Sequence, residues 1–488
     1  MTEDISPAVK TFESNYILNN NINPTQNIAL FVGEFEKGNI NEPKLISSAL
    51  EFKLEFGRAT DLNFNDWYQV YNYLQYPGSP KIWVCRTSGE VNTNAYNNGT
   101  VANSPGSWGN LLTVEIYHKN NFDSYLNGVF NVYDTRELND YLVIIRRKEN
   151  IVENFSINLD TELNSNYIST INLQEGVYKL YGGYSDPATI VDYTESFNLF
   201  TKENYEIDIV IAPEYYNEAV IEFVESRKDC IGFLSIPRQI IEYLMINGVK
   251  LATEDGRLIV LSIKNFMATK ADYDTIVNYI EKLQKSMYCF MTLGFKIQMD
   301  GFSGTKRIVN VSGDIAGLKA ASSSINPWGV GAGIERGTVK NAEGYTMKLK
   351  KSEADKLYKL GVNTLSNGVL MSQKLFISSD TIVSRLNQRC ILNHLERITE
   401  KLTRYYIFDE NSRNTRATVA MALKKMLEDI LSSGGITAGK VIVTTDKSNK
   451  IIINIYIKMP FITDFVKVGL LNTGTNSIMF INELTKEI

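Results

Sequence analysis

The sequence predicts a multidomain α/β and α+β protein. An α/β core domain carries an inserted β-rich domain, and a C-terminal α+β domain follows, with extended arms at both chain ends. Three observations predict this. Buried-type strands alternate with helical patterns on both sides of a region of short β-branched and aromatic runs. Two amphipathic helices and a β-hairpin lie near the C-terminus. A strand-like tail then follows without an evident partner.

Length and composition set the first bounds on function. At 488 residues the chain has room for about three domains, and 44% hydrophobic with 22% charged residues is ordinary for a globular protein in water. A net charge of −5 gives no reason to expect a nucleic-acid partner, which calls for a basic face. We find no N-terminal apolar leader and no run near the roughly 20 apolar residues that span a bilayer. We therefore expect a cytoplasmic origin and no membrane insertion.

Residues 1–24 are predicted to form an N-terminal arm. They are polar and rich in Asn, with too little apolar surface to fold alone. One stretch alternates in the manner of a strand, at Phe12, Ser14, Tyr16 and Leu18.

The α/β core domain is predicted from residues 25–104 and 200–345. Its first part contains a buried-type strand at residues 27–35, a helix at residues 67–76 and a strand at residues 81–86. The same alternation resumes after residue 200. Between the two parts, at 105–199, short β-type runs separated by Asn, Asp and Gly turns predict the inserted β-rich domain.

The C-terminal domain is predicted at residues 346–460. Residues 388–406 form an amphipathic helix with an apolar stripe at Ile391, Leu395, Ile398, Leu402 and Tyr405. A break rich in capping residues, 408–415, precedes a second amphipathic helix, which Gly434 ends.

A β-hairpin is predicted from residues 440–445 and 450–458, which are rich in β-branched residues around the turn DKSN. Two strands alone are marginally stable in water, so this hairpin needs support. Pro460 ends its second strand because proline lacks a donor N–H. Residues 461–488 are predicted to form a C-terminal arm, with a strand at residues 465–471.

No catalytic or metal-binding motif is found. The only histidines, His118 and His394, lie in different predicted domains, and we interpret His394 as a satisfied packing residue. The glycines of residues 326–337 and the segment 302–307 lack the spacing that cradles a phosphate, so both are predicted turns. The carboxylates Asp61, Asp66, Asp160 and Asp192 form no motif and are expected on a solvated surface. Cys85, Cys230, Cys289 and Cys390 are far apart and are expected to be reduced and buried. We therefore expect no enzyme activity, no metal and no cofactor.

Three basic residues share one face of the first C-terminal helix. Arg397, Lys401 and Arg404 lie at positions i, i+4 and i+7, adjacent to the apolar stripe. This face is either an ordinary solvated helix surface or a basic ridge that contacts an acidic partner.

Seven sequence segments, which follow one another in the same order, resemble those of one protein family. They are ALFVGEFEKGNINEPKLISSALEFKLEFG at 29–57, SPGSWGNLLTVEI at 104–116, SRKDCIGFLSIP at 226–237, SGDIAGLKAASSSINPWGVGAGIERG at 312–337, KLYKLGVNTL at 356–365, RLNQRCILNHLERI at 385–398 and FDENSRNTRATV at 408–419. Together they resemble the contractile tail sheath proteins of bacteriophages and related contractile particles. The sequence of residues 305–317 departs from the family pattern. The predicted insertion beyond residues 108–110 (WGN) shows no resemblance to the family.

The resemblance implies a structural role in a virion tail that is assembled in the host cytoplasm. Sheath subunits form stacked six-fold rings around an inner tail tube protein, and their other partners are baseplate and tail terminator proteins. When the baseplate triggers it, the extended sheath contracts and drives the tube through a bacterial envelope, without a nucleotide. The same subunit would serve a headless bacteriocin-like injector. An enzyme with an α/β core, or a surface-binding module built on the insertion, remains as a different class of function.

The resemblance also implies that arms are exchanged between neighbouring subunits. The donating residues would be the four alternating N-terminal ones together with Phe465, Val466, Val468 and Leu470. The acceptor would be the hairpin, through Val441, Val443, Ile451, Ile453 and Ile455. A donated strand satisfies the unpaired N–H and C=O groups of a sheet edge. The basic ridge at Arg397, Lys401 and Arg404 becomes a candidate for contact with the tube, since a modest charged contact can hold one state and be broken.

Overall fold

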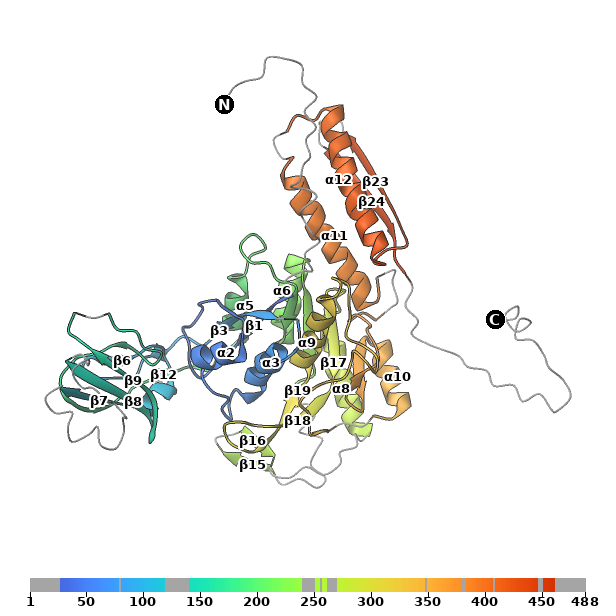
Figure 1. Cartoon of the computed structure of the whole chain (residues 1–488). Coiled ribbons are helices and arrows are strands. Elements are labelled where there is room, and N and C mark those ends of the chain that lie inside the picture. Colours follow the sequence, from blue (N-terminus) through green and yellow to red (C-terminus); the bar gives the residue numbers. More distant parts are fainter. Residues whose placement is uncertain are drawn as a thin grey trace, which may run out of the picture.

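The computed structural model describes residues 27–78, 80–118, 140–160, 162–238, 251–254, 257–260, 270–346, 349–378, 383–406, 409–445 and 451–460. Figure 1 shows a central sheet with helices on both sides, a β unit beside it and an elongated helix and hairpin unit that projects from it. The predicted arms, with all eight of their candidate residues, lie outside the described part of the chain. No helix in the described ranges is long and apolar enough to cross a membrane.

An eight-stranded sheet forms the centre of the core, in the order β2-β3-β1-β13-β14-β17-β21-β22. Its inner strands run parallel, and β2 and β22 are antiparallel edge strands. The strands are β1 (Ile28–Gly33), β2 (Lys44–Ile46), β3 (Lys81–Arg86), β13 (Ile209–Ile211), β14 (Ile231–Ser235), β17 (Cys289–Leu293), β21 (Val362–Ser366) and β22 (Val369–Leu370). All six residues of β1 are buried, as the sequence predicts for a strand covered on both faces.

Helices cover both faces of this sheet. Alternate residues of β1 point to opposite faces, so Ala29 and Phe31 belong to one apolar cluster, and Leu30 and Val32 to the other. The first cluster includes residues of α2 (Ala49–Phe56), α3 (Phe64–Leu74) and α9 (Ser312–Ser323). The second includes residues of α5 (Ile190–Asn198), α6 (Asn217–Arg227), α8 (Lys270–Lys282) and α10 (Lys351–Lys359). This is a three-layer α/β core.

A smaller sheet completes the core. It has the order β19-β18-β20 and consists of β18 (Phe295–Met299), β19 (Lys306–Asn310) and β20 (Gly344–Tyr345). A separate hairpin joins β15 (Leu251–Glu254) and β16 (Arg257–Val260). Residues 326–337 contain turns and no helix or strand, as predicted. The prediction of a turn for residues 302–307 is right only for its first part, because Lys306 and Arg307 begin β19.

The β unit beside the core has its own apolar cluster, which draws on residues from Ala95 to Leu180. The elements of this unit span residues 92–185, so the insertion begins and ends earlier in the sequence than the predicted range, 105–199. Its elements are β4 (Asn92–Thr93), β5 (Tyr96–Asn97), β6 (Thr100–Ala102), the short 3-10 helix η1 (Ser107–Leu111), β7 (Leu112–His118), β8 (Tyr141–Arg147), β9 (Asn150–Ile157), β10 (Ile168–Thr170), β11 (Gly176–Lys179) and β12 (Tyr184–Ser185).

Three basic side chains join this β unit to the core. Arg147 of β8 forms an ion pair with Glu36, which follows β1. Arg86 donates to the carbonyl oxygens of Gly38 and Pro105 at 2.7 and 2.8 Å. Lys37 lies 4.8 Å from the ring centre of Tyr167, and burial lowers the pKa of Lys37 to about 8.

The elongated unit consists of α11 (Leu386–Arg404), α12 (Arg413–Ser432), β23 (Ala438–Thr445) and β24 (Ile451–Lys458). Both predicted helices and the predicted hairpin are confirmed. The range predicted for the C-terminal domain, 346–460, also contains α10, β21 and β22, which belong to the core.

Candidate functional site

The C-terminal hairpin is supported by a helix on one face. The side chain of Ser412 accepts the backbone N–H of Thr415 at 3.1 Å and so begins α12, and Gly434, at φ 77°, follows its end. β23 pairs with β24 in antiparallel register, with Val441 opposite Ile455. Along β24 the odd-numbered residues are half-buried and the even-numbered ones exposed, so the strand has one apolar face.

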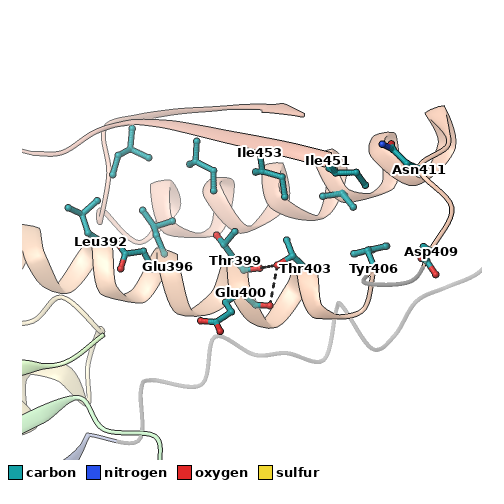
Figure 2. Close-up of a pocket in the computed structure, with 14 residues that line it drawn as sticks. Leu392, Glu396, Thr399, Glu400, Thr403, Tyr406, Asp409, Asn411, Ile451 and Ile453 are labelled. Carbon is teal, nitrogen blue, oxygen red and sulfur yellow. Dashed lines mark hydrogen bonds between the residues drawn. The ribbon is translucent and has the colours of Figure 1, made fainter. Parts of the chain in front are cut away.

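A groove of about 1010 Å³ runs between β24 and α11. Figure 2 shows the isoleucines of β24 on one wall and side chains of α11 on the other. The lining residues are Leu392, Leu395, Glu396, Thr399, Glu400, Thr403, Tyr406, Asp409, Asn411, Val419, Ile451, Ile453, Ile455 and Ile457. The groove is therefore mainly apolar along the strand and mixed along the helix.

Two threonines of α11 make the helical wall less polar than its sequence indicates. The hydroxyl of Thr403 donates to the carbonyl oxygen of Thr399 at 2.8 Å, one turn earlier. The hydroxyl of Thr399 is buried and has no hydrogen-bond partner among the described residues. Such a group costs free energy until something supplies a partner.

Of the predicted acceptor residues, Ile451, Ile453 and Ile455 line the groove, and Val441 and Val443 pack against the apolar cluster beside it. Within the described ranges β24 pairs with β23 and with no second strand. The α11 wall of the groove, at Leu392, Glu396, Thr399 and Thr403, was not predicted from the sequence. The i, i+4 spacing of the two threonines was the available signal.

The apolar stripe predicted on α11 is correct along most of the helix. Ile391 and Leu395 are buried, and Ile398 and Leu402 pack against the core cluster. Tyr405 is 77% exposed, so its assignment to the stripe is wrong, and Tyr406 lines the groove instead.

The predicted basic ridge is not a continuous exposed surface. The Arg397 side chain is 16% exposed and forms an ion pair with Asp208. It also donates to the carbonyl oxygens of Ile207 and Asp229, each at 3.1 Å. The expectation of an exposed side chain is therefore wrong for Arg397. Its guanidinium group binds the Asp208 carboxylate and the two carbonyl oxygens that precede β13 and β14. Arg397 fixes α11 to the core.

The other two basic residues lie at the surface. Lys401 pairs with Glu206 at 2.6 Å, and Arg404 pairs with Glu400 at 3.0 Å. Lys202 also pairs with Glu400, at 2.9 Å, and hydrogen bonds from Lys202 and then Arg404 lower the pKa of this carboxyl group. Tube contact stays a prediction, and it concerns Lys401 and Arg404.

His394 is a buried packing residue, as predicted, but it is not satisfied. The centres of the His394 and Trp328 rings are 6.1 Å apart, and neither nitrogen of His394 has a hydrogen-bond partner among the described residues. His118 lies in the β unit, far from it in the fold.

The carboxyl edge of the sheet is where α/β proteins usually bind ligands. Asp66 of α3 accepts the backbone N–H of Glu214 at 3.0 Å, and Glu34 accepts that of Ala188 at 3.0 Å. Burial, followed by the charge of Glu214, raises the pKa of Asp66. The expectation of a solvated surface is therefore wrong for Asp66. These carboxylates hold loops together.

The described part of the chain contains no group of three or more His, Cys, Asp or Glu side chains that could hold a metal ion. All four cysteines are free and buried, as predicted. Burial raises the pKa of Cys85 to about 12 and raises those of the other three thiols.

Solved structures with this fold define the class of protein. The structure superposes on the sheath tail protein of Listeria innocua with a TM-score of 0.58 at 14% identity, covering 88% of this chain and 91% of that one. For the sheath tail protein of Desulfitobacterium hafniense the TM-score is 0.57 at 10% identity, covering 89% of this chain and 96% of that one. A chain of the anti-feeding prophage baseplate gives a TM-score of 0.53 at 12% identity, covering 97% of this chain and 98% of that one. The fold is that of contractile sheath subunits.

Sequence matches agree with this class. No protein-family model matches the chain. It is 24% identical over 386 residues to the tail sheath protein of Vibrio phage KVP40, covering 70% of this chain and 56% of that protein. It is 21% identical over 444 residues to the tail sheath protein of Enterobacteria phage T4, covering 78% and 65%. The chain is a relative of the phage tail sheath proteins, so the resemblance seen in its sequence is confirmed, and these relatives indicate a structural role.

The chain spans less than two thirds of the length of these two relatives. What those longer proteins do as a whole does not transfer to it directly.

Proposed function

We propose that this chain is the structural subunit of a contractile tail sheath. It polymerises around an inner tube and, when a baseplate triggers it, contracts and drives the tube through a bacterial envelope. It is a particle component without enzyme activity, assembled in the host cytoplasm and located in the tail. The observation that carries this proposal is the groove between β24 and α11, which is lined by four isoleucines and lies beside the outer edge of β24.

The edge of β24 supports strand donation. In the described part of the chain this strand has one partner, so its outer edge offers backbone N–H and C=O groups to a further strand. A strand added there would continue the sheet toward α11. Its inward side chains would then meet the wall formed by Leu392, Leu395 and Thr399.

The groove is also too apolar to be left in contact with water at low cost. Four isoleucines of β24 line it together with two leucines of α11. Burying apolar surface contributes about 25 cal/mol per Å².

We propose that the donors are the terminal arms of neighbouring subunits. Phe12, Ser14, Tyr16 and Leu18 form one alternating segment, and Phe465, Val466, Val468 and Leu470 belong to the other. Alternation suits a strand with one face on an apolar groove and one in solvent. Arms from two neighbours would link the subunits into a lattice that stays joined while the subunits move.

Blocking the groove tests this proposal. We expect the purified full-length chain to form rings or tubes in negative-stain micrographs. Thr399→Trp places a large ring in the groove and should leave folded subunits that do not polymerise. Met421→Trp is the matched control, because Met421 is exposed on α12 and does not line the groove. Deleting residues 1–20, or those after Pro460, should have the same effect as Thr399→Trp. Polymerisation by the Thr399→Trp variant or by the truncated chains would count against arm exchange.

A headless injector remains the second candidate, because a baseplate chain of the anti-feeding prophage has the same fold over nearly its whole length. The genes beside this one separate the two, since capsid and terminase genes belong with a phage.

A further inference from the structure

A small cavity with both polar and apolar lining residues lies where α11 meets the core. Its volume is about 30 Å³, and its lining includes Asp208, Asp229, Lys319 and Asn393. His394 also lines it and is only 5% exposed, with no hydrogen-bond partner for Nδ1 or Nε2 among the described residues. A neutral imidazole offers one donor and one acceptor, so two hydrogen bonds are missing in a buried place.

The size and charge of the cavity identify its occupant. A cavity needs roughly 10–15 Å³ to hold a water molecule, and such a water needs two to four polar partners. Each of the two carboxylates already pairs with an arginine, Asp208 with Arg397 and Asp229 with Arg227, so a neutral molecule fits the cavity better than a cation. One water molecule meets both conditions.

His394 is also surrounded by charge from each element that faces the cavity. Arg397 belongs to its own helix, Lys319 belongs to α9, and Asp208 and Asp229 precede β13 and β14. The Cys390 thiol, also on α11, is neutral because burial raises its pKa. Arg397 pairs with Asp208, and Arg227 of α6 pairs with Asp229, so a further positive charge on His394 would lack a free carboxylate partner there. Burial, followed by the charge of Arg397, lowers the pKa of His394 to about 4.

We propose that one buried water bonded to His394 fills this cavity. We further propose that protonation of His394 breaks the contact between α11 and the core, here called the joint, and releases α11 before the central sheet unfolds. The C-terminal unit would then be the acid-sensitive part of the subunit. This inference does not depend on the sheath function, because it concerns the folded chain itself.

The direction of the pH effect follows from the two protonation states. An unfolded histidine has a pKa of about 6.5, whereas that of His394 in the fold is about 4. Above pH 6.5 both states are neutral and the joint has its full stability. As the pH falls from 6.5 toward 4, His394 is protonated when α11 is released but stays neutral when α11 is packed on the core. Proton binding therefore favours the released state, and the joint weakens.

Hydrogen exchange of the full-length chain, read by mass spectrometry and corrected for the intrinsic effect of pH, tests this. We expect opening of α11 peptides to increase roughly 20-fold from pH 7 to pH 5, with little change in β1. His394→Gln should abolish the increase, and His118→Gln, which alters the other histidine of the chain, should retain it.

Three results would overturn the proposal: α11 and β1 opening together, an unchanged increase in His394→Gln, or a high-resolution map with an empty cavity. If His394→Gln fails to fold, His394→Asn takes its place, and the map still decides whether the water is present.

Discussion

Arg397 of α11 forms an ion pair with Asp208, which immediately precedes strand β13. Asp208 also accepts the backbone N–H of Ile28, at 3.3 Å, at the beginning of β1. A single carboxylate therefore connects the helix that carries the groove to two adjacent strands of the core sheet. This contact adds to the apolar packing of Ile391 and Leu395 in holding α11 on the core.

Replacing Arg397 should loosen this connection. Arg397→Ala removes the charged partner of Asp208 and the donor to two carbonyl oxygens, and removing one partner of a buried pair costs roughly 3 kcal/mol. Arg404→Ala is the matched control, since its exposed pair with Glu400 contributes well under 1 kcal/mol. Urea unfolding followed by circular dichroism measures both. Equal stability of the two variants would show that the Arg397 contact is not structural.

The buried pair of Lys296 and Asp314 gives a second prediction. The atoms Nζ and Oδ1 are 2.9 Å apart, with both side chains at 1% exposure or less, and Tyr76 donates to the same oxygen at 3.1 Å. Lys296→Met alone should cost about 3–5 kcal/mol, because it strands a buried carboxylate. The double change Lys296→Met with Asp314→Leu should recover most of this loss. A double variant less stable than the single one, measured by thermal unfolding, would contradict this account.

Close packing of α3 and α9 depends on a glycine. A Cβ atom at Gly313 would lie 2.2 Å from the carbonyl oxygen of Gln69 on α3. Gly313→Ala should therefore force the helices apart and cost about 1–3 kcal/mol. Gly301→Ala is the control, because a Cβ there meets nothing within 4 Å. If both variants melt at the same temperature, the helices do not pack as described.

The four thiols should resist alkylation in the folded protein. All are buried, and burial raises their pKa values, so little thiolate exists at pH 8. We expect iodoacetamide to modify none of them at pH 8 until guanidinium unfolds the chain. Mass spectrometry counts the adducts, and rapid labelling of Cys390 in the native protein would place that part of α11 away from the core.

Sequence patterns predicted elements better than the contacts between them. The apolar stripe from Ile391 to Leu402 has the period of a helix, and the alternation along β24 has the period of a strand. These two patterns were sufficient to predict α11 and the hairpin. The groove depends on how these elements pack, and no local period records that. Thr399 therefore passed unnoticed.

The inward turn of Arg397 has the same cause. Its spacing from Lys401 and Arg404 placed all three on one helix face, but the carboxylate that draws Arg397 inward is 189 residues away in sequence. Asp66 was misjudged for a similar reason, since its partner is the backbone of Glu214. Long-range partners of charged residues are fixed by the assembled core and leave no local pattern.

The central claim is that the groove between β24 and α11 receives a strand from another subunit. A cryo-electron microscopy reconstruction of the polymer formed by the full-length chain tests it most directly. We predict that an extended segment of a neighbouring chain pairs with β24 and covers Ile453 and Thr399. An empty groove in the polymer, or a groove filled by the subunit's own arm, would contradict the account.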